Sequence, residues 1–236
     1  MRSDMQYLAN QIPDSATRRA VQQLIIETIQ DARVPQWGDR DNYTRIEADG
    51  TIKFVGNATV WEDLRVPMTA TKGGGVREPG FAKLKDNGDG STGVYAYWFD
   101  KTNIEELFFA CQLPHSWAGT LIYPHVHFVP KTDGGATHRV RWGLEYTWAG
   151  MGQVYGDTNI LYASSAAALD AGRHYLTPFA AITPNVGQAT LSSMLVCRVF
   201  RDATHTGDDY DDDAGLLEID FHYEINTVGS REPLSK

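Results

Sequence analysis

Apolar and polar residues alternate in two segments of this chain with a period of two, which is typical of a β-strand with one buried face. In the first segment the apolar positions are Val140, Trp142, Leu144, Tyr146 and Trp148. In the second they are Leu217, Ile219, Phe221, Tyr223 and Ile225. Both segments predict long strands that pack one face on a ring-rich core.

Shorter patterns add further elements. Strand-like runs occupy about 104–112, 120–129 and 191–201, and Asp49-Gly50 lies between two alternating runs, which predicts a tight hairpin. The stretch 150–187 is less regular, and one helical turn is an option for its segment SSAAALDAG (164–172), whose small residues give little local signal. Eight to ten strands with turn signals between them predict a mainly β protein, an antiparallel jelly-roll β-sandwich.

One helix is predicted ahead of the strands, over residues 14–33, with Asp14 or Ser15 as its N-cap. The expected domains are therefore an N-terminal helical arm, residues 1–38, and a sandwich domain, residues 39–236. The helix has an apolar stripe that must pack on the sandwich or on neighbouring subunits, and the sequence leaves both open. The candidate interface residues are Val21, Leu24, Ile25, Ile29 and Trp37.

Composition and charge narrow the classes of function. The net charge of -9 argues against direct binding of nucleic acid, which requires clustered Lys and Arg. No secretory signal or membrane-spanning run is recognised, so we expect a protein kept in the cytosol or in an assembly formed there. Cys111 and Cys197 lie in apolar runs and are expected to be buried free thiols.

A histidine pair is the main candidate for chemistry. His125 and His127 stand two apart and would point to one side of a strand, and with Gly119 they match the opening of the cupin metal motif. The glutamate position of that motif holds Lys131 or Thr132, and its second half has no counterpart. His115 could approach the pair across a hairpin. We expect these three histidines to fill a sheet face, with no metal or other cofactor, no catalytic residue and no enzymatic activity.

Three further features have a structural interpretation. The run DDYDDDAG (208–215) has some of the spacing of a calcium loop, but strand-like flanks favour a solvated loop, and calcium binding stays open. Glycines 73–75 indicate a flexible arm and no phosphate site. Among the tryptophans, Trp142 and Trp148 are expected in the core, whereas Trp37, Trp61 and Trp117 adjoin turns and are candidates for exposed contacts or subunit interfaces.

The segments ATVWEDLRVP, YWF, EELFFACQLPHSW, IYPHVHFVP and RVRWGLEYTWAG, in this order between Ala58 and Gly150, resemble a group of tailed-bacteriophage and prophage structural proteins. The resemblance covers about two fifths of the chain. It implies a jelly-roll virion component assembled in the host cytoplasm, most simply a homotrimeric capsid decoration (cement) protein that binds phage capsid or neck proteins. The alternatives are a tail or neck fibre, a host-surface carbohydrate-binding protein and, last, a cupin-like metalloenzyme.

Overall fold

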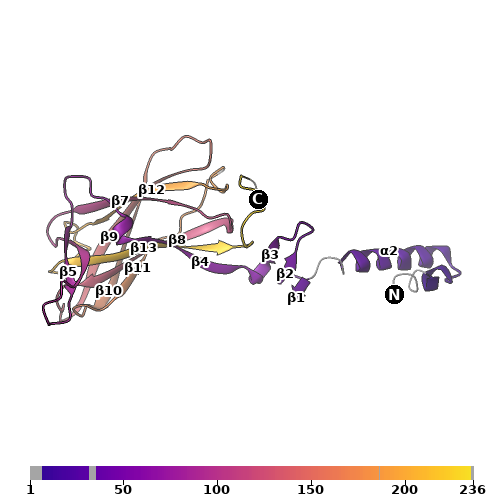
Figure 1. Cartoon of the computed structure of the whole chain (residues 1–236), viewed down its shortest axis with the longest axis horizontal. Coiled ribbons are helices and arrows are strands. Elements are labelled where there is room, and N and C mark those ends of the chain that lie inside the picture. The colour runs from indigo at the N-terminus through magenta and orange to yellow at the C-terminus, as the bar shows by residue number, and fades with distance from the viewer. Residues whose placement is uncertain (1–6, 32–35, 186, 235–236) are drawn as a thin grey trace. The chain divides into compact units, whose positions relative to one another are not determined.

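The computed structural model describes residues 7–31, 36–185 and 187–234, and it divides into two compact units (Figure 1). The N-terminal unit runs to Thr59 and includes Asn226–Val228; the sandwich unit comprises Val60–Ile225 and the residues from Gly229 onward. This division differs from the predicted boundary at residue 38. The reason is that a small sheet following the helix groups with the helix and not with the sandwich.

The N-terminal unit contains helix α2 (Ser15–Asp31) and an antiparallel sheet of β1 (Gln36–Gly38), β2 (Tyr43–Ile46) and β3 (Ile52–Val55). Asp14 caps α2, because its Oδ2 accepts a 2.6 Å hydrogen bond from the backbone N–H of Thr17. The contacts with Thr17 also lower the pKa of Asp14. Between β2 and β3, Gly50 adopts a φ of 86°, as a tight turn requires. The predicted helix and hairpin are both confirmed.

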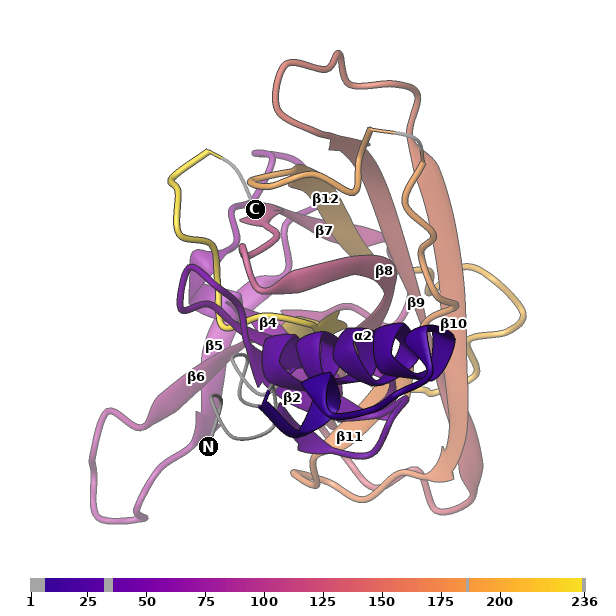
Figure 2. The same cartoon turned by 90° about the vertical axis from the view of Figure 1, so that its right-hand side faces the viewer.

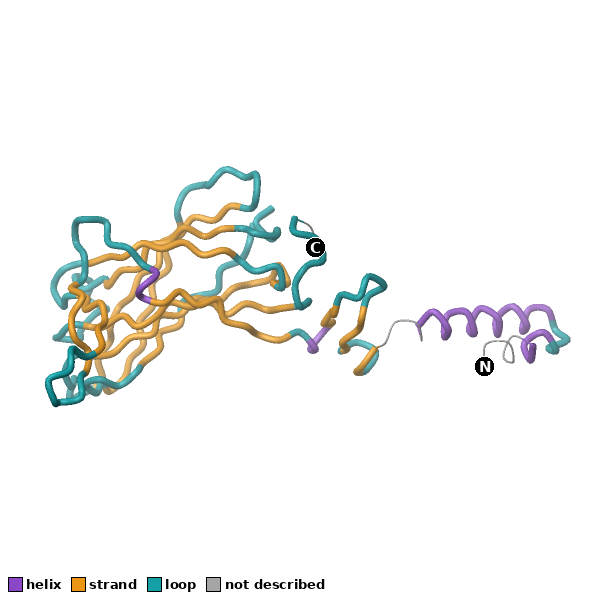
Figure 3. The backbone as a smooth tube through the Cα atoms, in the orientation of Figure 1, coloured by secondary structure: helices purple, strands orange, loops and turns teal. Residues whose placement is uncertain are grey.

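Ten strands and two short 3-10 helices make up the sandwich region together with the linker ahead of it (Figure 3). They are η1 (Gly56–Ala58), β4 (Val60–Pro67), η2 (Met68–Ala70), β5 (Gly80–Lys85), β6 (Val94–Phe99), β7 (Glu105–Gln112), β8 (Trp117–Pro130), β9 (Thr137–Ala149), β10 (Asn159–Ala168), β11 (Tyr175–Pro178), β12 (Met194–Arg201) and β13 (Ala214–Ile225). One sheet has the order β10-β9-β12-β7 and the other β11-β8-β13-β6-β5, with β4 paired to β13.

The strand order is that of a jelly roll. Eight strands, β6 to β13, form the roll. In the larger sheet the order is β11-β8-β13-β6, which are the sixth, third, eighth and first of the eight. In the smaller sheet the order is β10-β9-β12-β7, which are the fifth, fourth, seventh and second. The chain thus crosses between the sheets at most of its connections, and every pairing is antiparallel. Figure 2 shows the long strands β9 and β10 running beside each other. The predicted mainly β, antiparallel jelly-roll sandwich is confirmed.

The core lies between the two sheets and is rich in rings. Trp142 is fully buried and meets Phe99 edge to face at 5.1 Å, and Trp148 is also buried, as predicted. Cys111 and Cys197 are buried free thiols, also as predicted. A contact with Cys111 together with burial raises the pKa of Cys197 well above its ordinary value. Both thiols therefore behave as apolar core groups.

Two sequence predictions are wrong within the sandwich unit. The segment 164–172 is not a helical turn, because its first residues extend β10 and pair with β9, for example Ala166 with Arg139. Small residues have weak local preferences, so the neighbouring strand decides their conformation. Trp117 is only 5% exposed, and its ring centre lies 5.6 Å from that of Trp148 in a tilted contact, so it is a core residue and not a surface contact.

Candidate functional site

A cluster of histidines and aspartates lies on the outer face of the larger sheet. On β8, Val126 and Phe128 point into the core, so the intervening His125 and His127 face outward. On β13, Ile219 and Phe221 are likewise buried, which turns Asp220 outward between them. The register places Asp220 directly opposite His125. We call the set His125, His127, His174, His222, Asp63 and Asp220 the histidine–aspartate cluster.

Asp220 is the centre of the cluster and is only 5% exposed. Its Oδ1 lies 3.5 Å from Nδ1 of His125, and its Oδ2 lies 3.4 Å from Nε2 of His127 and 3.4 Å from Nε2 of His222. These separations are long for hydrogen bonds to a carboxylate, which are usually about 2.7–2.9 Å. Among the described residues, Oδ1 of Asp220 and Nδ1 of His125 are buried with no hydrogen-bond partner.

The other members surround this centre. Nε2 of His222 lies 2.9 Å from Oδ1 of Asp63 on β4, and the rings of His125 and His222 are 4.2 Å apart. On the far side, Nδ1 of His127 and Nε2 of His174 are 2.7 Å apart, which fixes the His127 ring with Nε2 toward Asp220. The cluster therefore joins β4, β8 and β13 with the segment ahead of β11.

Burial first, and the neighbouring His222 second, lower the pKa of His125 from its ordinary value of 6.5. A neutral imidazole has a free lone pair, which is the form that binds a metal ion. One ligand atom from each of His125, Asp220 and His222 lies within 4.8 Å of the others. Two imidazoles and a carboxylate at this spacing are a ligand set for a divalent transition metal.

The structure brings together two of the three histidines that the sequence singled out. His125 and His127 share one face, as predicted, and both face Asp220. His115 lies ahead of β8, where its ring nitrogens contact Oγ of Ser230 at 2.6 Å and Oγ of Ser192 at 3.2 Å. The pair also faces away from the sandwich interior, which differs from the inward-facing pair that a cupin-like site requires.

Four members of the cluster are absent from the sequence prediction: His174, His222, Asp63 and Asp220. The sequence did contain part of the information. Asp220 and His222 alternate with the apolar Ile219 and Phe221, so both had to lie on the outer face of their strand. The missing information was the pairing of β13 with β8, about a hundred residues apart. Strand partners at such separations do not follow from periodicity.

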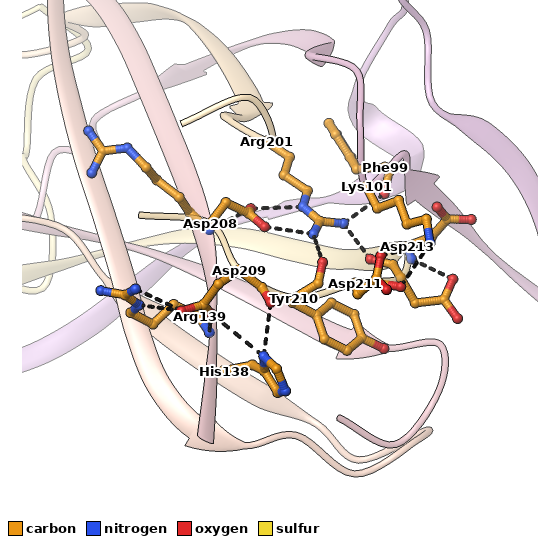
Figure 4. A network of polar contacts seen from close by, with 12 residues as sticks. Phe99, Lys101, His138, Arg139, Arg201, Asp208, Asp209, Tyr210, Asp211 and Asp213 are labelled. Carbon is orange, nitrogen blue, oxygen red and sulfur yellow. Dashed lines mark hydrogen bonds and ion pairs between the residues drawn. The ribbon is translucent and has the colours of Figure 1, made fainter. Parts of the chain in front are cut away.

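The aspartate-rich loop 208–213 is built around a buried guanidinium (Figure 4). Arg201 is fully buried and donates to both carboxylate oxygens of Asp208 at 2.9 and 2.8 Å. The same group donates to the carbonyl oxygens of Tyr210 and Asp212 at 2.8 and 2.7 Å. The loop is therefore folded around an internal cation.

The remaining aspartates of the loop also have partners. Arg139 binds Asp209 through two nitrogens, and the Thr132 hydroxyl donates to Asp212 at 2.8 Å. Lys101 and Lys131 pair with Asp211 and Asp213 at 2.8 and 2.6 Å. The predicted solvated loop is only partly right, because the side chain of Asp211 is 92% exposed while most carboxylates of the loop pair with Lys and Arg side chains of the same chain.

The candidate interface residues lie in the N-terminal unit. Val21 and Ile25 are half-buried, whereas Leu24 is 61% and Trp37 59% exposed. The side chain of Ile29 lies outside the described residues. Tyr7 and Leu8 are each 65% exposed in the turn of helix that precedes α2. The apolar stripe of α2 thus leaves substantial area open to solvent.

A hollow of about 390 Å³ lies at the β5–β6 end of the larger sheet. Trp98 lines it, with its Nε1 donating to the carbonyl oxygen of Ala82 at 3.3 Å. The other lining residues are Gly80, Ala82, Lys83, Leu84, Asp100, Glu105, Lys131 and Asp213. Burial raises the pKa of Glu105. One ring among several carboxylates and amines is a polar hollow that suits a hydroxylated ligand.

No protein-family model matches the sequence, and no curated protein matches it. Among solved structures, a chain of the infectious bursal disease virus Gx strain is similar over 81% of this chain and 40% of its own length, at 11% identity and a TM-score of 0.35. The CBM35 module from Cellvibrio japonicus Abf62 is similar over 74% and 99%, at 9% identity and a TM-score of 0.33.

A third structure is TmCBM27, a carbohydrate-binding module studied for specific mannan recognition. It is similar over 70% of this chain and 98% of its own, at 15% identity and a TM-score of 0.31. The chain spans well under half the length of the viral chain. These values are too low to transfer a function or a residue role. Within the described residues, no helix is long and apolar enough to cross a membrane.

Proposed function

We propose that this chain is a non-enzymatic structural protein of a bacteriophage virion, a capsid decoration protein that assembles as a homotrimer and binds neighbouring capsid subunits. The observation that carries the proposal is the exposed apolar stripe of α2 in a unit separate from the sandwich. The jelly-roll connectivity and the resemblance of the segments from Ala58 to Gly150 to phage structural proteins support it.

The physical argument starts from α2 itself. A helix of 17 residues gains little from its own backbone in water and depends on packing of its apolar face. Leu24 in this face is 61% exposed and would release water on packing, at about 25 cal/mol per Å² of apolar surface. In the proposal, α2 packs with the same helix of two further copies, and the N-terminal unit of the trimer contacts the capsid.

The first test measures size in solution by light scattering. The full chain should be a trimer, and a chain of residues 39–236 should be a monomer that keeps its sandwich. This truncation leaves β2 and β3 in place, with Phe54 still donating to the carbonyl oxygen of Asn226 at 2.8 Å. Leu24→Glu should dissociate the trimer, whereas Gln23→Glu, which adds the same charge next to it in the helix, should not. A monomeric full chain would contradict the trimer.

The second test is mass spectrometry of gradient-purified particles from cells that encode the chain. The full chain should be present at a fixed ratio to the major capsid protein, and the 39–236 truncation should be absent from otherwise complete particles. If truncated chains enter the particles, residues 1–38 are not needed for binding to the capsid, which contradicts the proposed role of the N-terminal unit. A full chain missing from the particles would overturn the virion assignment.

A second candidate, binding of a host-surface carbohydrate, is favoured by the hollow at Trp98. A ring with a fixed orientation beside carboxylates and amines is able to stack on a sugar and bind its hydroxyl groups. Trp98→Ala should then abolish retention on immobilised host polysaccharide. The control Trp61→Ala removes an exposed ring outside the lining of the hollow and should retain full binding. Equal retention of the two variants would exclude this hollow as the carbohydrate-binding site.

A further inference from the structure

The ligand atoms around Asp220 are spaced for a metal ion. Bonds of about 2.1 Å from a tetrahedral zinc-type ion to nitrogen and oxygen place neighbouring ligand atoms about 3.4 Å apart. Nδ1 of His125 lies 3.5 Å from Oδ1 of Asp220, and Nε2 of His222 lies 3.4 Å from Oδ2 of the same carboxylate. One ligand atom from each of the three residues lies within 4.8 Å of the others. The same atoms are too far apart for good hydrogen bonds. The spacing therefore fits ligands around a shared ion better than ligands bonded to one another.

Burial gives the second, independent observation. Asp220 is 5% and His125 9% exposed, and Asp220 Oδ1 and His125 Nδ1 are buried without a hydrogen-bond partner among the described residues. A buried carboxylate oxygen without a hydrogen-bond partner is costly, because it has lost its hydration shell. Both side chains point into the cluster. A cation at this position would satisfy both atoms at once.

We propose that His125, Asp220 and His222 form a binding site for one divalent transition-metal ion on the outer face of the larger sheet. Asp63 on β4, whose Oδ1 lies 2.9 Å from Nε2 of His222, is at hydrogen-bond distance from that ring and orients it. The ion then joins β8 and β13, the strands on which its three ligands lie. The side chains of His222 and Asp63 are 37% and 50% exposed, which opens a route for the ion from solvent.

The donor set selects the class of ion. Imidazole nitrogens suit zinc, nickel, copper and iron, whereas calcium and magnesium require six or more oxygen ligands. Nε2 of His127 also lies 3.4 Å from Oδ2 of Asp220, and its ring is held by His174, so in the proposal these two histidines orient the carboxylate without binding the ion. The site is distinct from the proposed subunit contacts, which lie in the N-terminal unit.

The test uses the full chain without an oligohistidine tag, treated with EDTA and titrated with Zn²⁺ by calorimetry. We expect one equivalent per chain. Asp220→Asn should weaken zinc binding more than about 100-fold, because loss of an outer-sphere partner costs at most about 100-fold and Asp220 is a direct ligand. Asp63→Asn should weaken zinc binding less. His115→Asn is the matched control, because His115 has two serine partners and lies outside the cluster. It should bind zinc like the unaltered chain.

Co²⁺ provides a second readout, since its visible absorption reports nitrogen and oxygen ligands in a tetrahedral arrangement. The unaltered chain and His115→Asn should give the same spectrum, which His222→Gln should abolish. If Asp220→Asn does not fold, as judged by circular dichroism, the proposal is tested with His222→Gln alone, because the His222 side chain is more exposed. Binding of less than one equivalent by the full chain, or equal affinity in the cluster variants and the His115 control, would overturn the proposal.

Discussion

Asp208 and Asp220 are both buried aspartates of the sandwich unit, and they differ in what surrounds the carboxylate. Asp208 has a side chain 2% exposed and receives two hydrogen bonds from the fully buried Arg201. Asp220 has a side chain 7% exposed and faces three imidazoles at 3.4–3.5 Å. One carboxylate has a permanent cation in hydrogen-bond contact, and the other has groups that are able to share an ion. The comparison separates a structural charge pair from a candidate binding site.

The largest expected effect comes from removing the permanent cation. Arg201→Met keeps an unbranched apolar stem but removes the guanidinium and leaves Asp208 buried without its cation, so the free energy of unfolding should fall by about 3–5 kcal/mol. Urea unfolding measures the change. The control is Arg65→Met, which breaks the surface pair with Glu218 and should cost no more than about 1 kcal/mol. Equal losses in the two variants would contradict the assigned importance of the buried pair.

The next largest effect is that of metal ions on the free energy of unfolding, which should differ between the Asp220 cluster and the 208–213 loop. Zn²⁺ at about 100 times its dissociation constant should raise the free energy of unfolding by about 2.7 kcal/mol, because the ion binds only the folded chain. Ca²⁺ should have no effect, since the carboxylates of the 208–213 loop already have partners within the chain. Thermal unfolding in EDTA, zinc and calcium tests both statements. A rise with calcium alone would move the binding site to the loop.

Neutralising Asp220 or Asp208 in metal-free solution tests the comparison further. In EDTA at pH 8, Asp220→Asn should leave the free energy of unfolding unchanged or raise it by about 1 kcal/mol, because it removes a buried charge whose Oδ1 has no hydrogen-bond partner among the described residues. Asp208→Asn should instead lower the free energy of unfolding by about 3 kcal/mol, because Arg201 then carries an unbalanced buried charge. Chemical denaturation of the two variants side by side measures the difference. A large loss in Asp220→Asn would mean that its imidazoles already balance the charge.

The smallest effect concerns a carboxylate at the rim of the loop. Hydrogen bonds from Arg139 lower the pKa of Asp209 below its ordinary 3.8, so any stability that this contact adds is present above pH 3.8 and is lost as the pH falls through the lowered pKa. Arg139→Gln should raise the pKa of Asp209 toward 3.8. A carboxyl NMR titration measures it, with Asp14, whose pKa is lowered by Thr17, as the internal control. An unchanged pKa of Asp209 would exclude Arg139 as the cause.

Much of the fold was accessible from the sequence. The alternation around Trp142 and Phe221 predicted two strands with one buried face, and Asp14 predicted the start of α2; all three are confirmed. The prediction was wrong where local signals are weak. Residues 164–168 have small side chains and become a strand only because β9 lies beside them, and Trp117 is buried by packing on Trp148.

The candidate site was accessible only in part. The spacing of His125 and His127 showed that they share a face, but their carboxylate was sought a few residues downstream, at Lys131 or Thr132. It comes instead from Asp220, on a strand that pairs with β8 across the sheet. The aspartate loop shows the same limit, since its central partner Arg201 reads in the sequence as one basic residue at the end of a strand.

By itself, the sequence determined which side chains of a regular strand share a face, because strand periodicity is a local property of the backbone. Only the tertiary structure decided which strands are neighbours, and therefore that Asp220 meets imidazoles while Asp208 meets a guanidinium. The physical reason is that pairing depends on the combined packing of the whole core and not on any one segment. The electrostatic character of a buried carboxylate depends on that pairing.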